Sequence, residues 1–205
     1  MQRPLSVMFM LLFSNGLPAN SSAPSVFQAF VELPNKLLNF QQDLSREKIV
    51  GDTNRTEKRE IAWGEGTIEV RKNVNTQFLK VDLVQPEARI QYTLRAFHSN
   101  AGHRMFLVQK QHCTSPGCEA TISVVEKQGS VWKNMSQSLL PDLSRPVLTR
   151  AYMETTGKSV SDSGEELDYH LQIPEEGNLI EVWNQYDEKM FALNWNGQKF
   201  VIKTR

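Results

Sequence analysis

Short apolar and polar runs alternate along most of this chain, and the spacing within them is that of strands. Between Glu60 and Phe97, apolar residues recur at every second position, as they do where one face of a strand is buried. Ile90, Tyr92 and Leu94, for example, share one face. Turn residues separate the runs at intervals of about ten residues without an intervening helical repeat, which predicts an antiparallel meander. The strands expected here are Glu60–Trp63, Thr67–Arg71, Phe78–Val84 and Arg89–Phe97.

The centre of the chain predicts a hairpin that is closed by its cysteines. Cys113 and Cys118 flank Pro116-Gly117, a pair that suits the two central positions of a type II turn. Two cysteines placed in this way face each other across the mouth of the hairpin, with Cα atoms about 4.4 to 6.8 Å apart. A disulfide that closes a loop this short stabilises the fold by about 2 kcal/mol on the chain-entropy model. The flanking strands are expected at Met105–Gln111 and Thr121–Lys127.

A metal site is the rival reading of the same cysteines. Four residues separate them, a spacing that zinc sites tolerate, but a tetrahedral site needs further ligands and the chain has no second cysteine pair. No C-x-x-C motif suggests a dithiol catalyst. We therefore expect a structural disulfide, no metal and no cofactor. The histidines weighed as additional ligands are His98, His103, His112 and His170.

Further strands are expected in the C-terminal half. Gln128-Gly129 is a turn signal before a strand that restarts at Val131, and Asn196-Gly197 is the strongest hairpin signal in the chain. The serine-, threonine- and glycine-rich stretch Glu154–Glu166 predicts a surface loop. The expected strands are Val147–Met153, Leu167–Ile173, Leu179–Tyr186, Met190–Trp195 and Lys199–Lys203.

The first 22 residues have the features of a signal peptide. Arg3 precedes an apolar run, Val7–Phe13, and small residues at Ala19–Ser22 offer a cleavage site. A core helix that starts at Pro4 is the alternative. Export makes the surroundings oxidising, so that a disulfide persists. We expect a secreted or periplasmic protein with one mature domain, residues 23–205, and no transmembrane segment, because the apolar run is too short to span a bilayer.

A helical segment is expected at residues 25–45, ahead of the strands. Apolar residues fall at helical spacing in Ser25–Leu33, where Ser25 can cap the helix and Pro34 stops it. A second helical stretch, Asn35–Leu44, follows, and the polar residues Gly51–Arg59 then predict a linker or exposed loop. The expected fold class is therefore mainly β or α+β: an antiparallel meander or sandwich with one or two N-terminal helices packed on it.

The order of motifs around the hairpin resembles a group of exported bacterial proteins of unknown function. These proteins have a strand, a cysteine hairpin, a second strand, a turn that ends in tryptophan and a Leu-Pro-x-Leu tail. The C-terminal LNWNGQKFVIK is similar to the usual ending of such domains. The resemblance implies a secreted β-rich domain and supplies no catalytic residue. The matching residues are Cys113, Cys118, Gly129, Trp132, Met135, Ser136, Leu140, Pro141 and Leu143.

Composition and motif content exclude several classes of function but do not identify the function. Lys and Arg equal Asp and Glu at 23 each, so the chain lacks the basic excess that nucleic-acid binding requires. No nucleophile elbow, phosphate-binding loop or dinucleotide fingerprint is present. The four tryptophans, on strand-like segments, are expected in the core, or else as a row that binds a glycan or peptide. They are Trp63, Trp132, Trp183 and Trp195.

These observations favour a non-enzymatic exported β-rich domain that binds a protein or glycan ligand or supports an envelope assembly. Two alternatives remain open at the level of sequence. One is a secreted or periplasmic hydrolase of glycans or peptides, whose paired carboxylates would come from separate strands. The other is an inhibitor-like protein that blocks a partner enzyme through a loop such as Glu154–Glu166. No catalytic residue is assigned, and the oligomeric state is not indicated.

Overall fold

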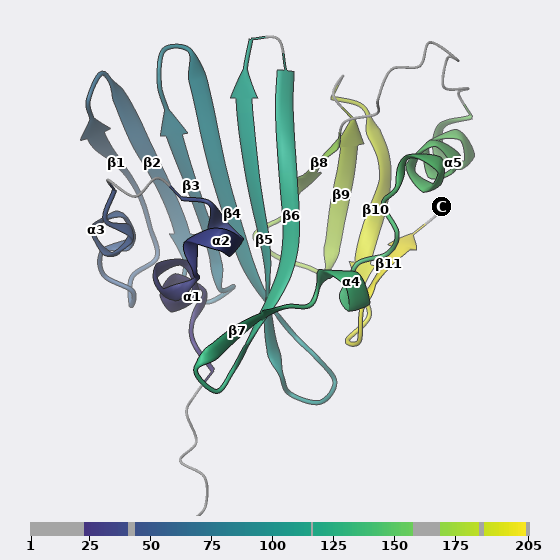
Figure 1. Cartoon of the computed structure of the whole chain (residues 1–205), viewed down its shortest axis with the longest axis horizontal. Coiled ribbons are helices and arrows are strands. Elements are labelled where there is room, and N and C mark those ends of the chain that lie inside the picture. The colour runs from purple at the N-terminus through teal and green to yellow at the C-terminus, as the bar shows by residue number, and fades with distance from the viewer. Residues whose placement is uncertain (1–22, 41–43, 116, 158–168, 185–186, 204–205) are drawn as a thin grey trace, which may run out of the picture.

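The chain folds into two antiparallel sheets with helices packed against them (Figure 1). The computed structural model describes residues 23–40, 44–115, 117–157, 169–184 and 187–203. These residues form eleven strands and five short helices, so the expected mainly β fold is confirmed. The signal-peptide prediction for residues 1–22 lies outside the described residues.

Sheet A is a meander of seven strands that pair in the order in which they occur along the chain. Every neighbouring pair is antiparallel and in register, because each short turn returns the chain directly alongside the preceding strand. The strand expected at Phe78–Val84 has those bounds, and the central hairpin strands are longer than expected. The strands are β1 (Glu57–Trp63), β2 (Gly66–Asn73), β3 (Phe78–Val84), β4 (Ala88–His98), β5 (Arg104–Thr114), β6 (Gly117–Gln128) and β7 (Val131–Asn134).

The N-terminal helices cover one face of sheet A. Ser25 caps α1 (Val26–Glu32): its hydroxyl accepts the Gln28 backbone N–H at 3.2 Å, while the Gln28 side chain accepts the Ser25 N–H at 2.8 Å. The second helix, α2 (Asn35–Leu38), is shorter than the expected Asn35–Leu44 because Asn39 turns left-handed with φ 48°. A third helix, α3 (Arg46–Val50), was not expected.

A large apolar core lies between these helices and the sheet. The helices contribute side chains such as Phe27 and Phe30, which are fully buried. Sheet A contributes alternate residues of β2 to β6, including Tyr92 and Leu94, as period-two burial requires. Phe30, Phe40 and Tyr92 form an aromatic cluster, with ring centroids 4.9 to 6.3 Å apart. Tyr92 and Leu94 were predicted to share one face of their strand, and the helices cover that face.

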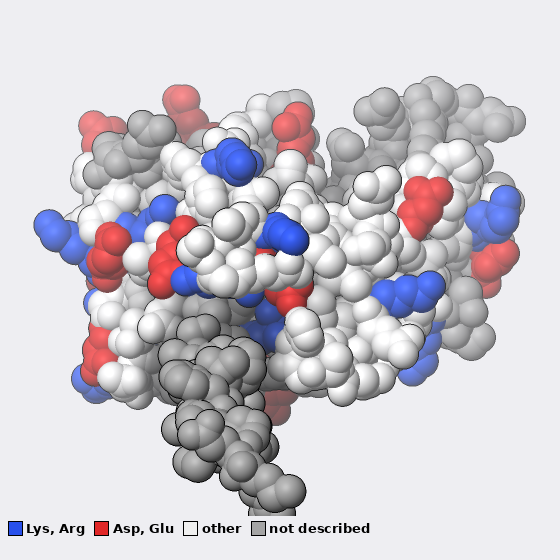
Figure 2. Space-filling model, turned by 60° about the horizontal axis from the view of Figure 1, so that its bottom comes forward, with Lys and Arg blue, Asp and Glu red and all other residues white. Residues whose placement is uncertain are grey.

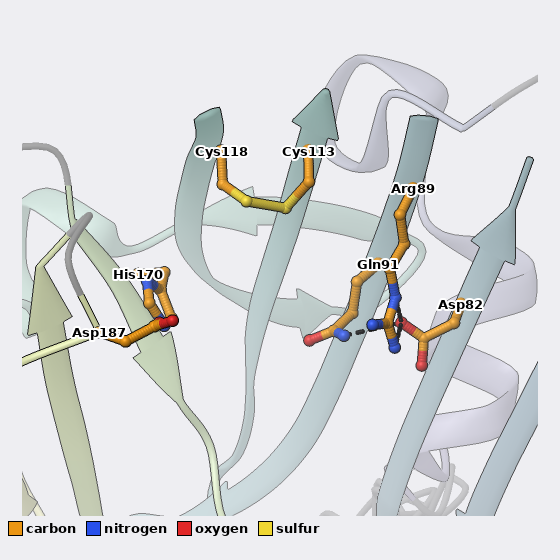
Figure 3. The surroundings of a disulfide bond; sticks show 7 residues. All are labelled: Asp82, Arg89, Gln91, Cys113, Cys118, His170 and Asp187. Carbon is orange, nitrogen blue, oxygen red and sulfur yellow. Dashed lines mark hydrogen bonds and ion pairs between the residues drawn. A yellow bond between two sulfur atoms is a disulfide. The ribbon is translucent and has the colours of Figure 1, made fainter. Parts of the chain in front are cut away.

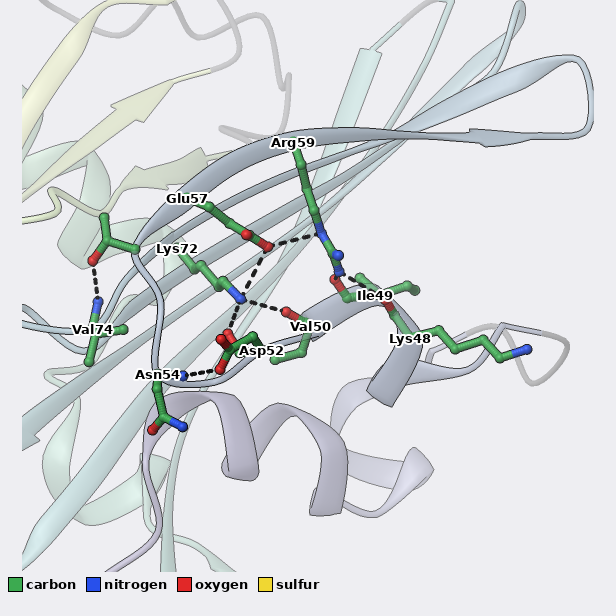
Figure 4. Close-up of polar contacts among 10 residues, drawn as sticks. Lys48, Ile49, Val50, Asp52, Asn54, Glu57, Arg59, Lys72 and Val74 are labelled. Carbon is green, nitrogen blue, oxygen red and sulfur yellow. Dashed lines mark hydrogen bonds and ion pairs between the residues drawn. The ribbon is translucent and has the colours of Figure 1, made fainter.

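Two cations fasten the end of α3 to the sheet (Figure 4). Lys72 is only 1% exposed; its Nζ donates to the carbonyls of Val50, at 2.8 Å, and Asp52, and lies 3.2 Å from the Glu57 carboxylate. Arg59 donates to two further carbonyl groups of α3. These contacts satisfy carbonyls that a helix end leaves unpaired. They also explain why the predicted loop Gly51–Arg59 ends early, with β1 starting at Glu57.

Sheet B has four strands and packs on the opposite face of sheet A, in strand order β11-β10-β9-β8. The second core lies between the two sheets, where Phe97 and Leu107 of sheet A meet Ile180 and Leu193 of sheet B. The sheets also join at their turns, because the Asn100 N–H donates to the Gly197 carbonyl at 2.8 Å. The strands are β8 (Tyr169–Gln172), β9 (Leu179–Asn184), β10 (Lys189–Trp195) and β11 (Phe200–Lys203).

The prediction of a strand at Val147–Met153 is wrong, because these residues belong to helix α5 (Arg145–Thr156). Pro146 lies in the first turn, where its fixed φ and missing N–H favour a helix. Leu148, Ala151 and Tyr152 follow at helical spacing and are buried in the second core. A shorter helix, α4 (Ser136–Leu139), precedes it. Most of the loop expected at Glu154–Glu166 lies outside the described residues; its first three residues belong to α5.

Candidate functional site

The face of sheet A that looks towards sheet B has an array of polar side chains. Strand register places Lys80 of β3 opposite Thr93 of β4, and Thr93 opposite Gln109 of β5. One step nearer the tip of the β5–β6 hairpin, Asp82, Gln91 and Gln111 form a second row. Side chains two residues apart on a strand share a face, so both rows lie on the same side of the sheet.

Strand β8 and the segment that follows it form a wall over this array. Together they enclose a cavity of about 280 Å³. The cavity is mostly polar, unlike the two apolar cores. Its lining residues are Lys80, Gln91, Thr93, Gln111, His170, Leu171, Gln172 and Ile173. We call this site the inter-sheet cleft.

Gln109 holds the wall in place at one end of the cleft. Its Nε2 donates to the Leu171 carbonyl at 2.9 Å, and its Oε1 accepts the Leu171 N–H at 2.7 Å. Gln109 is 1% exposed, so both hydrogen bonds are buried. Gln109 therefore satisfies the backbone N–H and C=O groups at the middle of the outer edge of β8. Without it, a neighbouring strand could pair with these groups.

The segment after β8 is fastened to sheet A as well. Arg95 donates to the Pro174 carbonyl at 2.7 Å. Glu175 forms an ion pair with Arg71 at 2.5 Å and accepts a hydrogen bond from Asn73 at 2.5 Å. The wall of the cleft is therefore held by polar contacts from three strands of sheet A, which makes the cavity a built feature of the fold.

Asp82 is a buried carboxylate next to the cleft, opposite Gln91 on the same face of sheet A (Figure 3). Its Oδ1 accepts hydrogen bonds from Arg89 Nε at 3.0 Å and from Gln91 Nε2 at 2.7 Å, and it lies 2.9 Å from a second guanidinium nitrogen. Its Oδ2 has Lys80 Nζ at 3.9 Å. The carboxylate is thus fixed through one oxygen and keeps acceptor capacity on the other.

Three polar side chains of the lining make no side-chain hydrogen bond within the part of the chain that the structure describes. They are Thr93, Gln111 and Gln172. Thr93 is the most informative, since only 3% of the residue is exposed and its hydroxyl opens onto the cavity. These groups supply hydrogen-bonding capacity at the surface of the cavity that the fold itself does not use.

His170 faces the cleft from β8, with Asp187 beside it (Figure 3). Burial lowers the pKa of His170, and Asp187 at 3.9 Å acts in the opposite direction. The net lowering keeps the imidazole mainly neutral at pH 7, where it offers one donor and one acceptor. The sequence had singled out His170 only as a possible metal ligand, and the structure places it in the lining of the cleft.

The structure contains the expected disulfide. Cys113 and Cys118 are joined at the tip of the β5–β6 hairpin, on the side of the sheet where Figure 3 shows Gln91 and His170. Their Cα atoms are 4.0 Å apart, closer than the expected range, because the two residues are a directly facing antiparallel pair. The turn differs from the expectation: Gly117 begins β6, and Pro116 lies outside the described residues.

The other histidines are spread over the fold. His103 Nδ1 lies 2.7 Å from Glu126 Oε1, and His98 accepts a hydrogen bond from Arg104 at 3.2 Å, both at the turn-side end of β4 and β5. His112 is exposed on β5. Among the described residues, no three His, Cys, Asp or Glu side chains gather where they could hold a metal ion.

The tryptophans do not form a row. Trp63 and Trp132, on the two edge strands of sheet A, pack against the helix-side core, and Trp195 is buried in the second core. Trp195 also donates to the His98 carbonyl at 2.8 Å. Trp183 donates to Glu181 at 3.2 Å. The expected packing in the core therefore accounts for three of the four tryptophans, Trp63, Trp132 and Trp195.

Charges are mixed on the surface, and none of the described helices is long and apolar enough to cross a membrane. Figure 2 shows Lys and Arg interspersed with Asp and Glu over one face of the molecule. The mixture agrees with the balanced charge of the sequence. No single-sign patch covers the face that Figure 2 shows.

Comparisons with known proteins support the fold. No protein-family model matches the chain, and no curated protein matches it. A solved structure of a domain of an uncharacterized protein from Porphyromonas gingivalis W83 is similar, with a TM-score of 0.55 and 14% sequence identity. The match covers 89% of this chain and all of that domain. At this identity the likeness shows a shared β-rich fold, and the motif resemblance to exported bacterial domains stays a prediction.

Proposed function

We propose that this protein is an exported, non-enzymatic binding domain and that the inter-sheet cleft is its binding site. One observation supports the binding role above the others: Thr93, only 3% exposed, lines a built cavity, and its hydroxyl opens onto the cavity without a hydrogen-bond partner among the described residues. A hydroxyl in this position is available to bond a ligand or water in the cavity. Gln111 and Gln172 extend the same unused capacity along the cavity.

The chemistry of the cleft supports binding over hydrolysis. Its described lining has one histidine and no carboxylate; beside it lie Asp82, which Arg89 and Gln91 already bond, and the exposed Asp187 near His170. A glycosidase needs two carboxylates on either side of the scissile bond. A nucleophilic mechanism needs a nucleophile and a base within hydrogen-bond reach, and no such pair is brought together among the residues that line this cavity.

The proposal of export rests on the signal-like start and on the disulfide. A disulfide persists in oxidising compartments such as the periplasm or the cell exterior. N-terminal sequencing of the native protein checks the processing, and we expect a mature chain that starts near Ser22. An intact Met1 on a protein recovered from the cytosol would refute this part of the proposal.

The binding role is tested by retention of material from the envelope of the producing cells. The processed protein is immobilised as wild type and as two single variants of β5. Gln111→Trp fills the cleft from its rim, whereas His112→Trp places the same side chain on the opposite, exposed face. We expect wild type and His112→Trp to retain the same component and Gln111→Trp to lose it. Equal retention by all three would exclude the cleft as the binding site.

A further inference from the structure

We infer that the inter-sheet cleft recognises a neutral saccharide. The inference rests on the proposed binding function and adds the class of ligand. Four features of the cleft lead to it: the charges beside it are paired, its remaining polar groups are mostly uncharged, its volume suits a compact ligand, and the adjacent strand edge is already paired.

The charged groups at the cleft already have partners within the protein. The ionisable residues of the described lining are Lys80 and His170; Lys80 Nζ lies 3.9 Å from the Asp82 carboxylate, and His170 is mainly neutral. Asp82 is also paired with Arg89 through two nitrogens. An anionic ligand at Lys80 would lie close to the Asp82 carboxylate, and a cationic ligand would find no carboxylate in the described lining, so both are unfavourable in a partly desolvated site.

The hydrogen-bonding groups match hydroxyls. Gln91 donates to Asp82 and so presents its carbonyl oxygen, while Gln111 and Gln172 offer both amide ends. A sugar hydroxyl is at once a donor and an acceptor, so it can pair with either end of an amide. Lys80 Nζ, which lines the cavity 3.9 Å from Asp82 Oδ2, adds a charged donor that can bond the oxygen of a hydroxyl.

The shape of the cleft favours a compact ligand. At about 280 Å³ it lies below the range of roughly 300 to 1,000 Å³ that drug-sized ligands occupy. Leu171 and Ile173 in the wall give it an apolar side, against which the C–H groups of a sugar ring can pack. Thr93, Gln91 and Gln111 lie opposite as the polar floor.

An extended peptide fits the same place poorly. A peptide strand would bind by adding to the outer edge of β8. Gln109 already bonds both the N–H and the C=O of Leu171 at the middle of that edge. Strand addition would have to break two buried hydrogen bonds, whereas a sugar in the cavity leaves both intact.

The test is a titration of the disulfide-intact processed protein, followed by calorimetry and by backbone amide shifts in NMR. The probes are neutral hexoses and N-acetylhexosamines with their disaccharides, a hexuronic acid, and an uncharged, blocked tripeptide, all at millimolar concentrations. We expect a neutral sugar to bind saturably, with shifts at Thr93, Gln111 and Gln172. Loss of one sugar contact in Thr93→Val or Gln111→Ala should weaken binding about tenfold. The matched control Gln85→Ala, an exposed amide in the β3–β4 turn, should leave affinity unchanged.

Several outcomes would overturn the inference. Binding of the hexuronic acid or the tripeptide alone would assign the cleft another ligand class. Neutral-sugar binding that Thr93→Val and Gln111→Ala leave unchanged would place the sugar elsewhere, and absence of saturable sugar binding would reject it outright. None of these results would by itself contradict the binding role, which is judged by Gln111→Trp against His112→Trp in the envelope retention experiment.

Discussion

The two faces of sheet A both bury polar side chains, and they use them in opposite ways. On the helix-covered face, Lys72 and Tyr92 are nearly inaccessible, and each donates to backbone carbonyls of the N-terminal segment. On the cleft face, Thr93 is almost as buried, yet its hydroxyl and the amide of Gln111 are unused among the described residues. A buried polar group with protein partners holds the fold together, whereas one without them at a cavity is available to a ligand.

The largest effect is expected from Lys72→Met on the helix-covered face. The change leaves the Glu57 carboxylate and two carbonyl groups without their buried cation, so the free energy of unfolding should fall by about 3 to 4 kcal/mol. Urea denaturation measures it. Lys58→Met, on an exposed position of β1, is the control and should change stability by less than about 0.5 kcal/mol. Equal effects of both variants would show that Lys72 does not anchor α3.

Gln109 and Gln111 allow the comparison to be sharpened on a single strand. They lie two residues apart on the same face, but only Gln109 is bonded to β8. Gln109→Leu should lower the free energy of unfolding by about 2 to 3 kcal/mol, because the N–H and C=O of Leu171 lose their partner. Gln111→Ala should change it by less than about 0.5 kcal/mol. If thermal denaturation finds the two variants equally destabilised, Gln111 has a structural role and the distinction fails.

The disulfide at the hairpin tip should contribute modestly. Cys113→Ser with Cys118→Ser is expected to fold normally and to lose about 2 kcal/mol of stability, or several degrees of melting temperature, because the closed loop is short. Free-thiol titration of the unreduced, denatured wild type provides the direct check. Two reactive thiols per chain would contradict the disulfide, and stoichiometric zinc alongside them would revive the metal site.

Tyr92 should give the smallest effect, and it depends on pH. Tyr92→Phe removes a hydroxyl that donates to the Asn39 carbonyl at 3.1 Å, a loss of about 1 kcal/mol at pH 7. Burial raises the pKa of Tyr92 from 10.0 to about 12, so the unfolded chain ionises first. Wild-type stability should therefore fall as pH rises from about 10 to about 12, and Tyr92→Phe should fall less. Parallel alkaline curves for the two proteins would count against this burial.

The sequence predicted most of the strands and the order in which they pair. Period-two alternation marked Phe78–Val84 with its observed bounds, and short turns left little choice but an antiparallel meander. The close spacing of Cys113 and Cys118 around a turn predicted their pairing, and Ser25 was predicted as the residue that caps α1. Each of these features depends on residues that are neighbours in sequence or in one hairpin, which is why local pattern was sufficient.

The expectations that failed depended on distant partners. The local sequence of Val147–Met153 does not distinguish a helix from a strand, because the segment is short. The segment is helical because the second core buries Leu148, Ala151 and Tyr152 on one side of it. The second helical stretch ended at Leu38 because Asn39 places its carbonyl where Tyr92 and Lys110 bond it. Such contacts cannot be found from local periodicity, since they join segments far apart in the sequence, 53 residues for Asn39 and Tyr92.

The cleft itself was decided only by the tertiary structure. In sequence, Gln91, Thr93, Gln109 and Gln111 are the ordinary polar positions of amphipathic strands, which usually face water. Gln109 meets Leu171 only because the chain returns 62 residues later to lay β8 across that face. The sequence by itself thus determined which side of each strand is polar. Long-range packing of sheet B determined that this polar side borders a cavity, because only burial turns a solvated glutamine into a binding group.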